Sequence, residues 1–156
     1  MPLWTIYHSD SIFKDEASKK ALAKAITDLH VNEIGLPAFY VVVAFVPFPP
    51  GSLFVGGEHK GTPFVRISIY QIARTMELDF YAPWTSMVDK MLEPHIAAKG
   101  YDWEYHIDES PLKLWKVNGV YAPEFGSPEM ELWKKYNRVI FPEEFDHAAA
   151  RAKTKL

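Results

Sequence analysis

The strongest constraint on the fold is a strand–helix–strand succession that occurs twice in this chain of 156 residues. Residues 2–8, PLWTIYH, form a short β-branched and aromatic run that is typical of a strand. Residues 14–35 follow with helical spacing, seen in the pair Leu22 and Ile26, and residues 38–48 are almost continuously apolar, as in a strand covered on both faces. This order predicts a β-α-β unit whose two strands are parallel and joined by a right-handed crossover.

The same pattern returns after a loop rich in Pro and Gly at residues 47–63. Residues 64–70 predict a strand, residues 82–100 an amphipathic helix that Pro94 kinks or shortens, and residues 101–107 another strand. The two units share no clear residue identity, so the repeat is one of architecture.

Together these patterns predict an α+β fold, a two-layer structure with two tandem β-α-β units. The units form one mixed sheet with two helices, followed by a C-terminal helical tail. We expect a single domain over residues 1–156, made of a first unit at 2–47, a second at 63–107 and a C-terminal extension at 108–156.

The extension predicts its own helix within residues 126–138, where Ser127 is placed as the N-cap and Pro128 as the first helical residue. A further helical turn or two is expected within residues 141–156. The segment is rich in large aromatic side chains, which favours docking on the chain's own core or on a neighbouring subunit; they are Trp115, Tyr121, Phe125, Trp133 and Phe141.

Composition excludes several classes of site and partner. With 17 Lys and Arg against 20 Asp and Glu, the formal net charge of −3 gives no general attraction to nucleic acid or to an anionic membrane. The chain has no Cys, which removes disulfides, thiolate nucleophiles and zinc–thiolate sites. No signal peptide, bilayer-spanning run or cofactor motif is visible, so we expect a cytoplasmic protein with no cofactor and no metal.

The amino terminus offers a different kind of chemistry. If Met1 is removed, Pro2 becomes a secondary amine that the first strand holds in place. Burial and nearby Arg side chains would lower the pKa of this amine toward neutrality. Such an amine can move a proton between the carbon and the oxygen of an enol, while Arg side chains hold a substrate carboxylate.

Several short segments, taken with the proline after Met1, resemble the tautomerase superfamily, and within it the cis-3-chloroacrylic acid dehalogenase branch. The resemblance covers about residues 2–120 and is carried by AKAITDLH (23–30), LFVGG (53–57), FVRISIYQIAR (64–74) and WEY (103–105). It implies two β-α-β units in each chain, a homotrimer, and an active site at the amino-terminal proline.

The resemblance also implies roles for four residues. Pro2 matches the catalytic proline, and His30 matches a histidine that binds the substrate carboxylate or positions water. Arg74 matches the second of two substrate-binding arginines, and Tyr105 matches a tyrosine that hydrogen-bonds water or a substrate oxygen. The implied ligand is a small carboxylate substrate.

Two positions depart from the family pattern. The first family arginine is replaced within IYQ (69–71), so Arg66 is the candidate substitute, provided that both arginines share one strand face. The glutamate that activates water in the dehalogenase aligns with Val117, which cannot take a proton. Hydrolytic dehalogenation is therefore disfavoured unless another acid reaches the site, namely Asp108, Glu109 or Glu124.

The sequence thus favours an isomerase that catalyses keto–enol tautomerisation of a 2-oxo acid. Three alternatives stay open. The first is a hydratase, dehalogenase or decarboxylase acting on 3-haloacrylate-like acids. The second is a non-enzymatic homologue that keeps the pocket for binding, and the third is an interaction scaffold that works through its aromatic tail.

Overall fold

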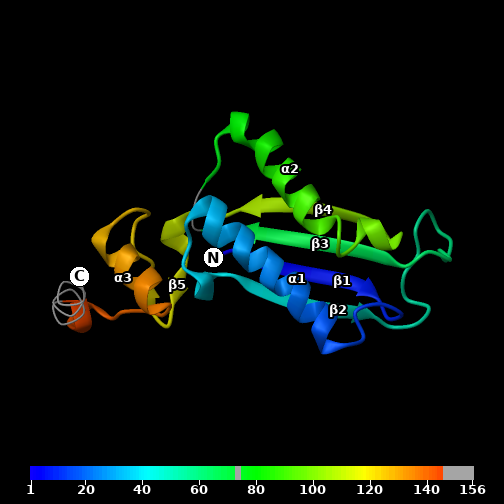
Figure 1. The fold of residues 1–156 in the computed structure, drawn as a ribbon, viewed down its shortest axis with the longest axis horizontal. Coiled ribbons are helices and arrows are strands. Elements are labelled where there is room, and N and C mark those ends of the chain that lie inside the picture. Colours follow the sequence, from blue (N-terminus) through cyan, green and yellow to red (C-terminus); the bar gives the residue numbers. More distant parts are fainter. Residues whose placement is uncertain (73–74, 146–156) are drawn as a thin grey trace.

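The computed structural model describes residues 1–72 and 75–145, and its main body holds two β-α-β units (Figure 1). The first unit consists of β1 (Leu3–Ser9), α1 (Glu16–Leu29) and β2 (Val42–Phe48). The second consists of β3 (Phe64–Gln71), α2 (Tyr81–Leu92) and β4 (Asp102–Glu109). Short helical turns join these elements at η2 (Ala38–Tyr40), η3 (Leu78–Phe80) and η4 (Ala97–Lys99).

The four long strands form one mixed sheet in the order β2-β1-β3-β4. Within each unit the two strands are parallel, and the units meet through antiparallel pairing of β1 with β3. The units therefore lie head to tail in the sheet, which confirms the predicted α+β class with two tandem β-α-β units.

Each unit begins with a proline that is tied to the second strand of its own unit. The Pro2 carbonyl accepts the backbone N–H of Val42 at 3.0 Å, and the Pro63 carbonyl accepts the backbone N–H of Asp102 at the same distance. Hydrogen bonding therefore continues one residue ahead of β1 and of β3.

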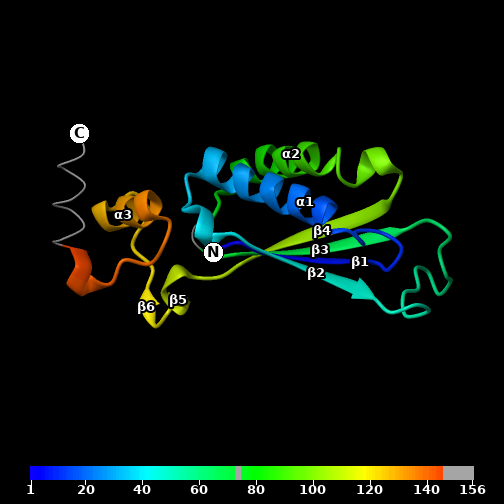
Figure 2. The same ribbon diagram turned by 60° about the horizontal axis from the view of Figure 1, so that its bottom comes forward.

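Helices α1 and α2 lie together on one face of the sheet and leave the other face open (Figure 2). Alternation along the central strands directs every second side chain into the layer under the helices, as with Trp4, Ile67 and Ile69, all fully buried. The helices supply the facing side chains of this core, including Leu22, Ile26, Trp84, Val88 and Leu92.

The prediction that the strand now labelled β2 is covered on both faces was wrong. The strand lies at an edge of the sheet, and Val42 and Val46 are 39% and 38% exposed. Because both crossover helices pack on the same face, no layer of the described part of the chain covers the other face of β2.

The helix ends follow the signals in the sequence. The Asp15 side chain accepts the Ser18 backbone N–H at 2.7 Å and caps α1. At its other end α1 widens into the π-helical turn η1 (His30–Ile34), which Gly35 terminates with a left-handed φ of 76°. Helix α2 ends at Leu92, two residues before Pro94, as the proline predicts.

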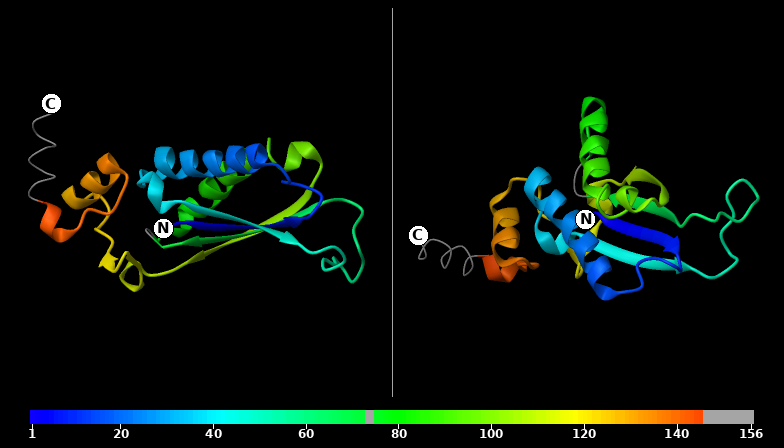
Figure 3. Two further views of the ribbon diagram at one scale, coloured as in Figure 1. Left: turned by 90° about the horizontal axis from the view of Figure 1, so that it is seen from below. Right: turned by 45° about the vertical axis from the view of Figure 1, so that its right-hand side comes forward.

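Beyond β4 the chain forms an appendage, residues 110–145, which lies beside the amino-terminal end of β1 (Figure 3). It contains η5 (Leu112–Leu114), β5 (Lys116–Val117), β6 (Val120–Tyr121), α3 (Pro128–Tyr136) and η6 (Pro142–Glu144). The Ser127 hydroxyl accepts the Met130 backbone N–H, which confirms the predicted N-cap. The turn η6 lies within residues 141–156, where a further helical turn or two was predicted. Residues 146–156 lie outside the described residues, and the division of the chain at 47, 63 and 107 stays a prediction.

The appendage shares a second hydrophobic cluster with the segment between α1 and β2. Trp133 is its largest buried member, and its indole N–H donates to the Ile140 carbonyl at 3.0 Å. The cluster is otherwise built from Leu36, Tyr40, Trp115, Met130, Val139 and Ile140. Its aromatic side chains therefore pack on this chain's own body.

Candidate active site

Pro2 lies in the interior of the sheet rather than at an edge. Its neighbour Leu3 pairs with Val42 of β2 on one side and with Tyr70 of β3 on the other. Pro2 is buried, and the hydrogen bond to Val42 fixes its backbone. The amino-terminal end of the chain is thus held in one place.

The chain amine at this end is strongly desolvated. Met1 is partly buried against the second hydrophobic cluster, and burial lowers the pKa of its amine from 8.0 to about 5. The positive charge of this amine also contributes to the lowered pKa of His30, so the two groups lie within electrostatic reach. An amine in these surroundings is largely a free base near neutral pH.

His30 lies at the junction of α1 and η1 and is only 1% exposed. Its Nε2 accepts the indole N–H of Trp4 at 2.9 Å, while its Nδ1 has no hydrogen-bond partner among the described residues. The ring of Trp84 lies 5.3 Å from the His30 ring. Burial first, and then the chain amine, lower the pKa of His30 from 6.5 to about 4, which leaves the imidazole neutral at pH 7.

Tyr105 lies on β4 and reaches toward α2. Its hydroxyl donates to Oδ1 of Asp89 at 2.8 Å and lies 3.3 Å from the Thr85 carbonyl. Burial, and then the hydrogen bond to Asp89, raise the pKa of the Tyr105 phenol. The structure does not bring Tyr105 into contact with His30. Trp84 is close to both residues, because its ring is near His30 and it lines the same cavity as Tyr105.

A largely apolar cavity of about 270 Å³, here called the tyrosine cavity, lies between α2 and β4. Its lining combines Trp84 and Tyr105 with Met76, Tyr81, Thr85, His106, Ile107 and Glu109. A second cavity of about 280 Å³, the glutamine cavity, shares Met76 with it and includes Ile34, Gln71, Thr75, Glu77, Asp79 and Phe80. The side-chain nitrogen of Gln71 is buried and has no partner among residues 1–72 and 75–145. These cavities lie toward the Pro2 end of the sheet, because Gln71 follows the residue that pairs with Leu3.

The two predicted arginines are not brought to Pro2 by the described part of the chain. Arg66 is exposed on the open face of the sheet and forms an ion pair with Glu104 of β4. Arg66 lies four residues before Tyr70, which pairs with Leu3, and is therefore well away from Pro2. Arg74 lies outside the described residues. Since β3 ends at Gln71, the two arginines do not share one unbroken strand.

Among the acids considered for water activation, Glu109 alone lines the tyrosine cavity. Its carboxylate accepts the Met76 backbone N–H at 2.9 Å, and its backbone pairs with Gln71. Asp108 instead contacts His106 at 3.3 Å, and Glu124 lines a pocket in the appendage. Val117 packs against the second hydrophobic cluster.

Sequence reasoning missed Trp4 and Trp84. Both are fully buried, and the Trp84 indole N–H has no partner within the described residues. Alternation in β1 does predict that Trp4 points inward, but an aromatic residue at such a position is usually core. Nothing local links Trp4 to His30, which lies 26 residues further along the chain.

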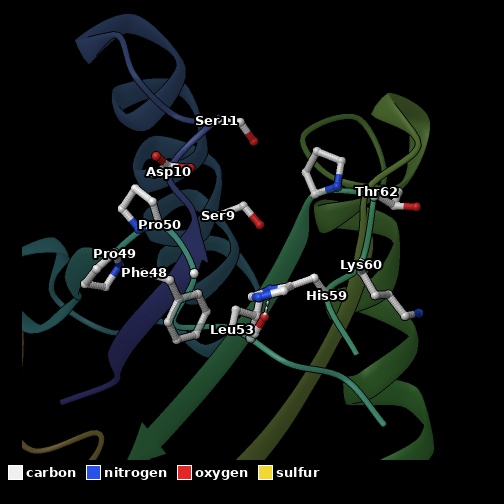
Figure 4. Close-up of a pocket in the computed structure, with 13 residues that line it drawn as sticks. Ser9, Asp10, Ser11, Phe48, Pro49, Pro50, Leu53, His59, Lys60 and Thr62 are labelled. Carbon is white, nitrogen blue, oxygen red and sulfur yellow. Dashed lines mark hydrogen bonds between the residues drawn. The ribbon is translucent and has the colours of Figure 1, made fainter. Parts of the chain in front are cut away.

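A different, polar cavity of about 190 Å³ lies at the opposite end of β1, beside the loop between β2 and β3 (Figure 4). Its basic groups already have partners. Lys60 forms an ion pair with Asp102 at 2.9 Å, and Nδ1 of His59 lies 3.2 Å from the Leu53 carbonyl. The cavity therefore offers less unsatisfied hydrogen bonding than the Pro2 end of the sheet.

The described residues contain no group of three or more His, Asp and Glu side chains placed to hold a metal ion. No helix in that part of the chain has the length and apolar character needed to cross a bilayer.

Comparison with known proteins agrees with the predicted resemblance. The family described as "Putative oxalocrotonate tautomerase enzyme" matches residues 1–138. The structure of RhCC from Rhodococcus jostii RHA1 is 39% identical, covers 89% of this chain and 99% of its own, and superposes with a TM-score of 0.84. A probable enzyme from the thermophilic fungus Aspergillus fumigatus is 41% identical over 90% of this chain and 97% of its own, with a TM-score of 0.82.

The fold extends to more distant structures. N1, a member of the cis-3-chloroacrylic acid dehalogenase family, is 16% identical, covers 95% of this chain and 99% of its own, and has a TM-score of 0.66. No curated protein matches the sequence. With two β-α-β units, a buried proline directly after Met1 and a family match over most of its length, this chain belongs to the oxalocrotonate tautomerase-like family of the tautomerase superfamily.

Proposed function

We propose that this protein is a tautomerase in which the secondary amine of Pro2, freed by removal of Met1, transfers a proton within a small 2-oxo acid. The observation that carries the proposal is the burial of Pro2 together with the chain amine that precedes it, within electrostatic reach of His30. Burial lowers the pKa of this Met1 amine to about 5. A Pro2 amine next to that position would meet the same desolvation. It would accept the enol O–H proton and return a proton to the adjacent carbon, giving the keto acid without a net change in charge.

His30 and Arg74 are proposed to bind the substrate carboxylate, as the family resemblance implies. His30 is suited to this role because it is fixed by Trp4 and buried near the amine. The proposal does not depend on Arg66, since Glu104 already neutralises its guanidinium on the open face.

Tyr105 is proposed to polarise a substrate oxygen or an ordered water from the tyrosine cavity by turning its single O–H hydrogen from Asp89 to that oxygen when the ligand binds. Replacing it by phenylalanine should lower turnover about 10²-fold, because one donor to the developing charge is lost. We also expect a stability loss of about 1 kcal/mol, because the hydrogen bond to the exposed Asp89 disappears. Steady-state kinetics and denaturant unfolding would measure the two effects.

Asp89→Asn is the matched control for Tyr105→Phe, since it weakens the same hydrogen bond but keeps the phenol. It should reproduce the stability loss and leave most of the turnover. Equal turnover losses in both variants would show that the hydrogen bond between Tyr105 and Asp89 matters only for structure and that the phenol does not act on the substrate.

Glu109 supports a second candidate function, hydration or hydrolytic dehalogenation of a 3-haloacrylate-like acid. Its carboxylate lines the same cavity as Tyr105 and is held by the Met76 backbone N–H, so it is placed to take a proton from water. Incubation with 3-haloacrylates and NMR of the products would separate this activity from isomerisation. Formation of a hydrated or dehalogenated product that Glu109→Gln abolishes would favour it.

A homotrimer is proposed as the working assembly. The sheet leaves one face uncovered, with Val42, Val46 and Tyr70 exposed. A fused 4-OT structure described as a symmetric trimer is 22% identical over 80% of this chain and 99% of its own, with a TM-score of 0.62. Light scattering of the purified protein should give three times the chain mass.

Intact-mass measurement of the native protein tests the central assumption directly. We expect a mass lower by one methionine, followed by covalent labelling of Pro2 by a 3-halopropiolate. Retained Met1 would make the Pro2 nitrogen an amide and would refute the mechanism. A processed terminus that takes up no label would instead favour the non-enzymatic homologue.

A further inference from the structure

The protonation of His30 can be deduced from its hydrogen bond to Trp4. The distance from Trp4 Nε1 to His30 Nε2 is 2.9 Å, and both residues are buried. An indole N–H can only donate, so His30 Nε2 must accept and carries no proton. The single proton of the neutral imidazole is therefore on Nδ1.

This assignment leaves a buried donor without an acceptor. His30 Nδ1 has no partner among the described residues, although the side chain is 1% exposed. The Trp84 indole N–H is also buried without a partner among the described residues, and its ring lies 5.3 Å from the His30 ring. An unsatisfied buried donor is costly, so two of them in neighbouring rings indicate a ligand that supplies acceptors.

The surroundings favour an oxygen acid as that ligand. The side-chain nitrogen of Gln71 is a third buried group without a partner among the described residues, and it lines the glutamine cavity, which shares Met76 with the cavity that Trp84 lines. The chain amine adds a nearby positive charge when it is protonated. Carboxylate and carbonyl oxygens accept from these N–H donors, whereas an ammonium ligand has no lone pair with which to accept.

We propose that Trp4 is a positioning residue that holds His30 as a neutral Nδ1–H donor, and that this donor and the Trp84 indole N–H together bind an oxygen of the acid substrate. The proposal rests on the proposed function for the identity of the substrate. A neutral donor binds the acid without placing a second full charge beside the catalytic amine. The lowered pKa of His30, caused by burial and by that amine, agrees with a neutral ring at pH 7.

The first test is NMR of the full-length ¹⁵N-labelled protein, because it reads the tautomer without turnover. Long-range ¹H–¹⁵N spectra should show His30 protonated at Nδ1 and bare at Nε2 at pH 7. Titration with pyruvate, a small 2-oxo acid, should shift the His30 Nδ1–H and Trp84 indole resonances downfield. The proposal is overturned by a proton on Nε2, or by pyruvate leaving both resonances unmoved.

The second test replaces Trp4 by phenylalanine, which removes the donor while keeping an aromatic ring in the core. His30 should then populate both tautomers, and KM should rise about tenfold with kcat changed less than about threefold. Trp133→Phe is the matched control, since it deletes another buried indole hydrogen bond, to Ile140 in the appendage. Its KM should stay at the wild-type value.

An equal rise in KM in the two variants would show general loosening and would overturn the role of Trp4. If Trp4→Phe does not fold, the wild-type tautomer and the pyruvate shifts still decide the proposal. Pro2→Ala separates the two proposals. If it keeps full activity, the proposed mechanism fails, while pyruvate shifts at His30 and Trp84 still support the donor pair.

Discussion

Pro2→Ala should lower tautomerisation of an enol acid by roughly 10²- to 10⁴-fold, the range that a positioned general acid–base group contributes. The variant keeps a terminal amine after Met1 removal but loses the ring that fixes it and the secondary nitrogen. Because the Pro2 backbone contact is made through its carbonyl, the hydrogen bond to Val42 survives the change. Initial rates with an aryl-pyruvate enol would measure the loss.

A tag retained ahead of Met1 gives a complementary test, since it keeps the proline ring but turns its nitrogen into an amide. It should reduce turnover as much as Pro2→Ala, while the same tag placed after residue 156 should not. Circular dichroism and assembly size should match the wild type in all three proteins. Undiminished turnover in both Pro2→Ala and the amino-terminally tagged protein would disprove the assignment.

The stability of the protein should fall on acidification because His30 is buried as a neutral ring. Its pKa is about 4 in the folded state against 6.5 ordinarily, so between these values the unfolded chain binds a proton that the folded protein does not. The free energy of unfolding is therefore unaffected by His30 above pH 6.5 and decreases as the pH falls toward 4. From this shift we expect a loss of about 2 kcal/mol between about pH 7 and pH 5.

His30→Gln would isolate this contribution, since glutamine can accept from Trp4 but does not titrate. Urea unfolding of the variant and of the wild type at several pH values should show a smaller acid-dependent loss in the variant. The buried chain amine adds a slope of the same sign, which His30→Gln should leave in place. Parallel pH dependences in the two proteins would mean that His30 is freely protonated in the folded state.

The fold was predictable because its signals are local. Helical spacing in residues 14–35 and the Ser127 cap each follow from residues a few positions apart, and both are present in the structure. The exposure of β2 was not predictable, because an apolar run indicates burial without indicating which layer provides it. That layer depends on the side of the sheet to which both crossover helices return.

The candidate site was predictable only in part. Pro2 and His30 were identified through a family resemblance, and the structure places a buried chain amine within electrostatic reach of His30. Trp4 and Trp84 escaped notice because their meaning depends on contacts between β1, α1 and α2, which sequence spacing does not encode. That Arg66 substitutes for the missing arginine stays a prediction; spacing in the sequence could not test it, because β3 ends at Gln71 and the strand does not continue to residue 74.

Pro2 and Pro63 hold matching positions in the two units, but their nitrogens differ in the chemistry open to them. The two units lie head to tail in the sheet, and each begins with a proline whose carbonyl accepts a backbone hydrogen bond from the second strand of its own unit. The nitrogen of Pro63 is acylated by Thr62, so its lone pair is delocalised and cannot serve as a base. In a chain that holds both units, the Pro63 nitrogen therefore always stays an amide, and only the Pro2 nitrogen can become a base, once Met1 is removed.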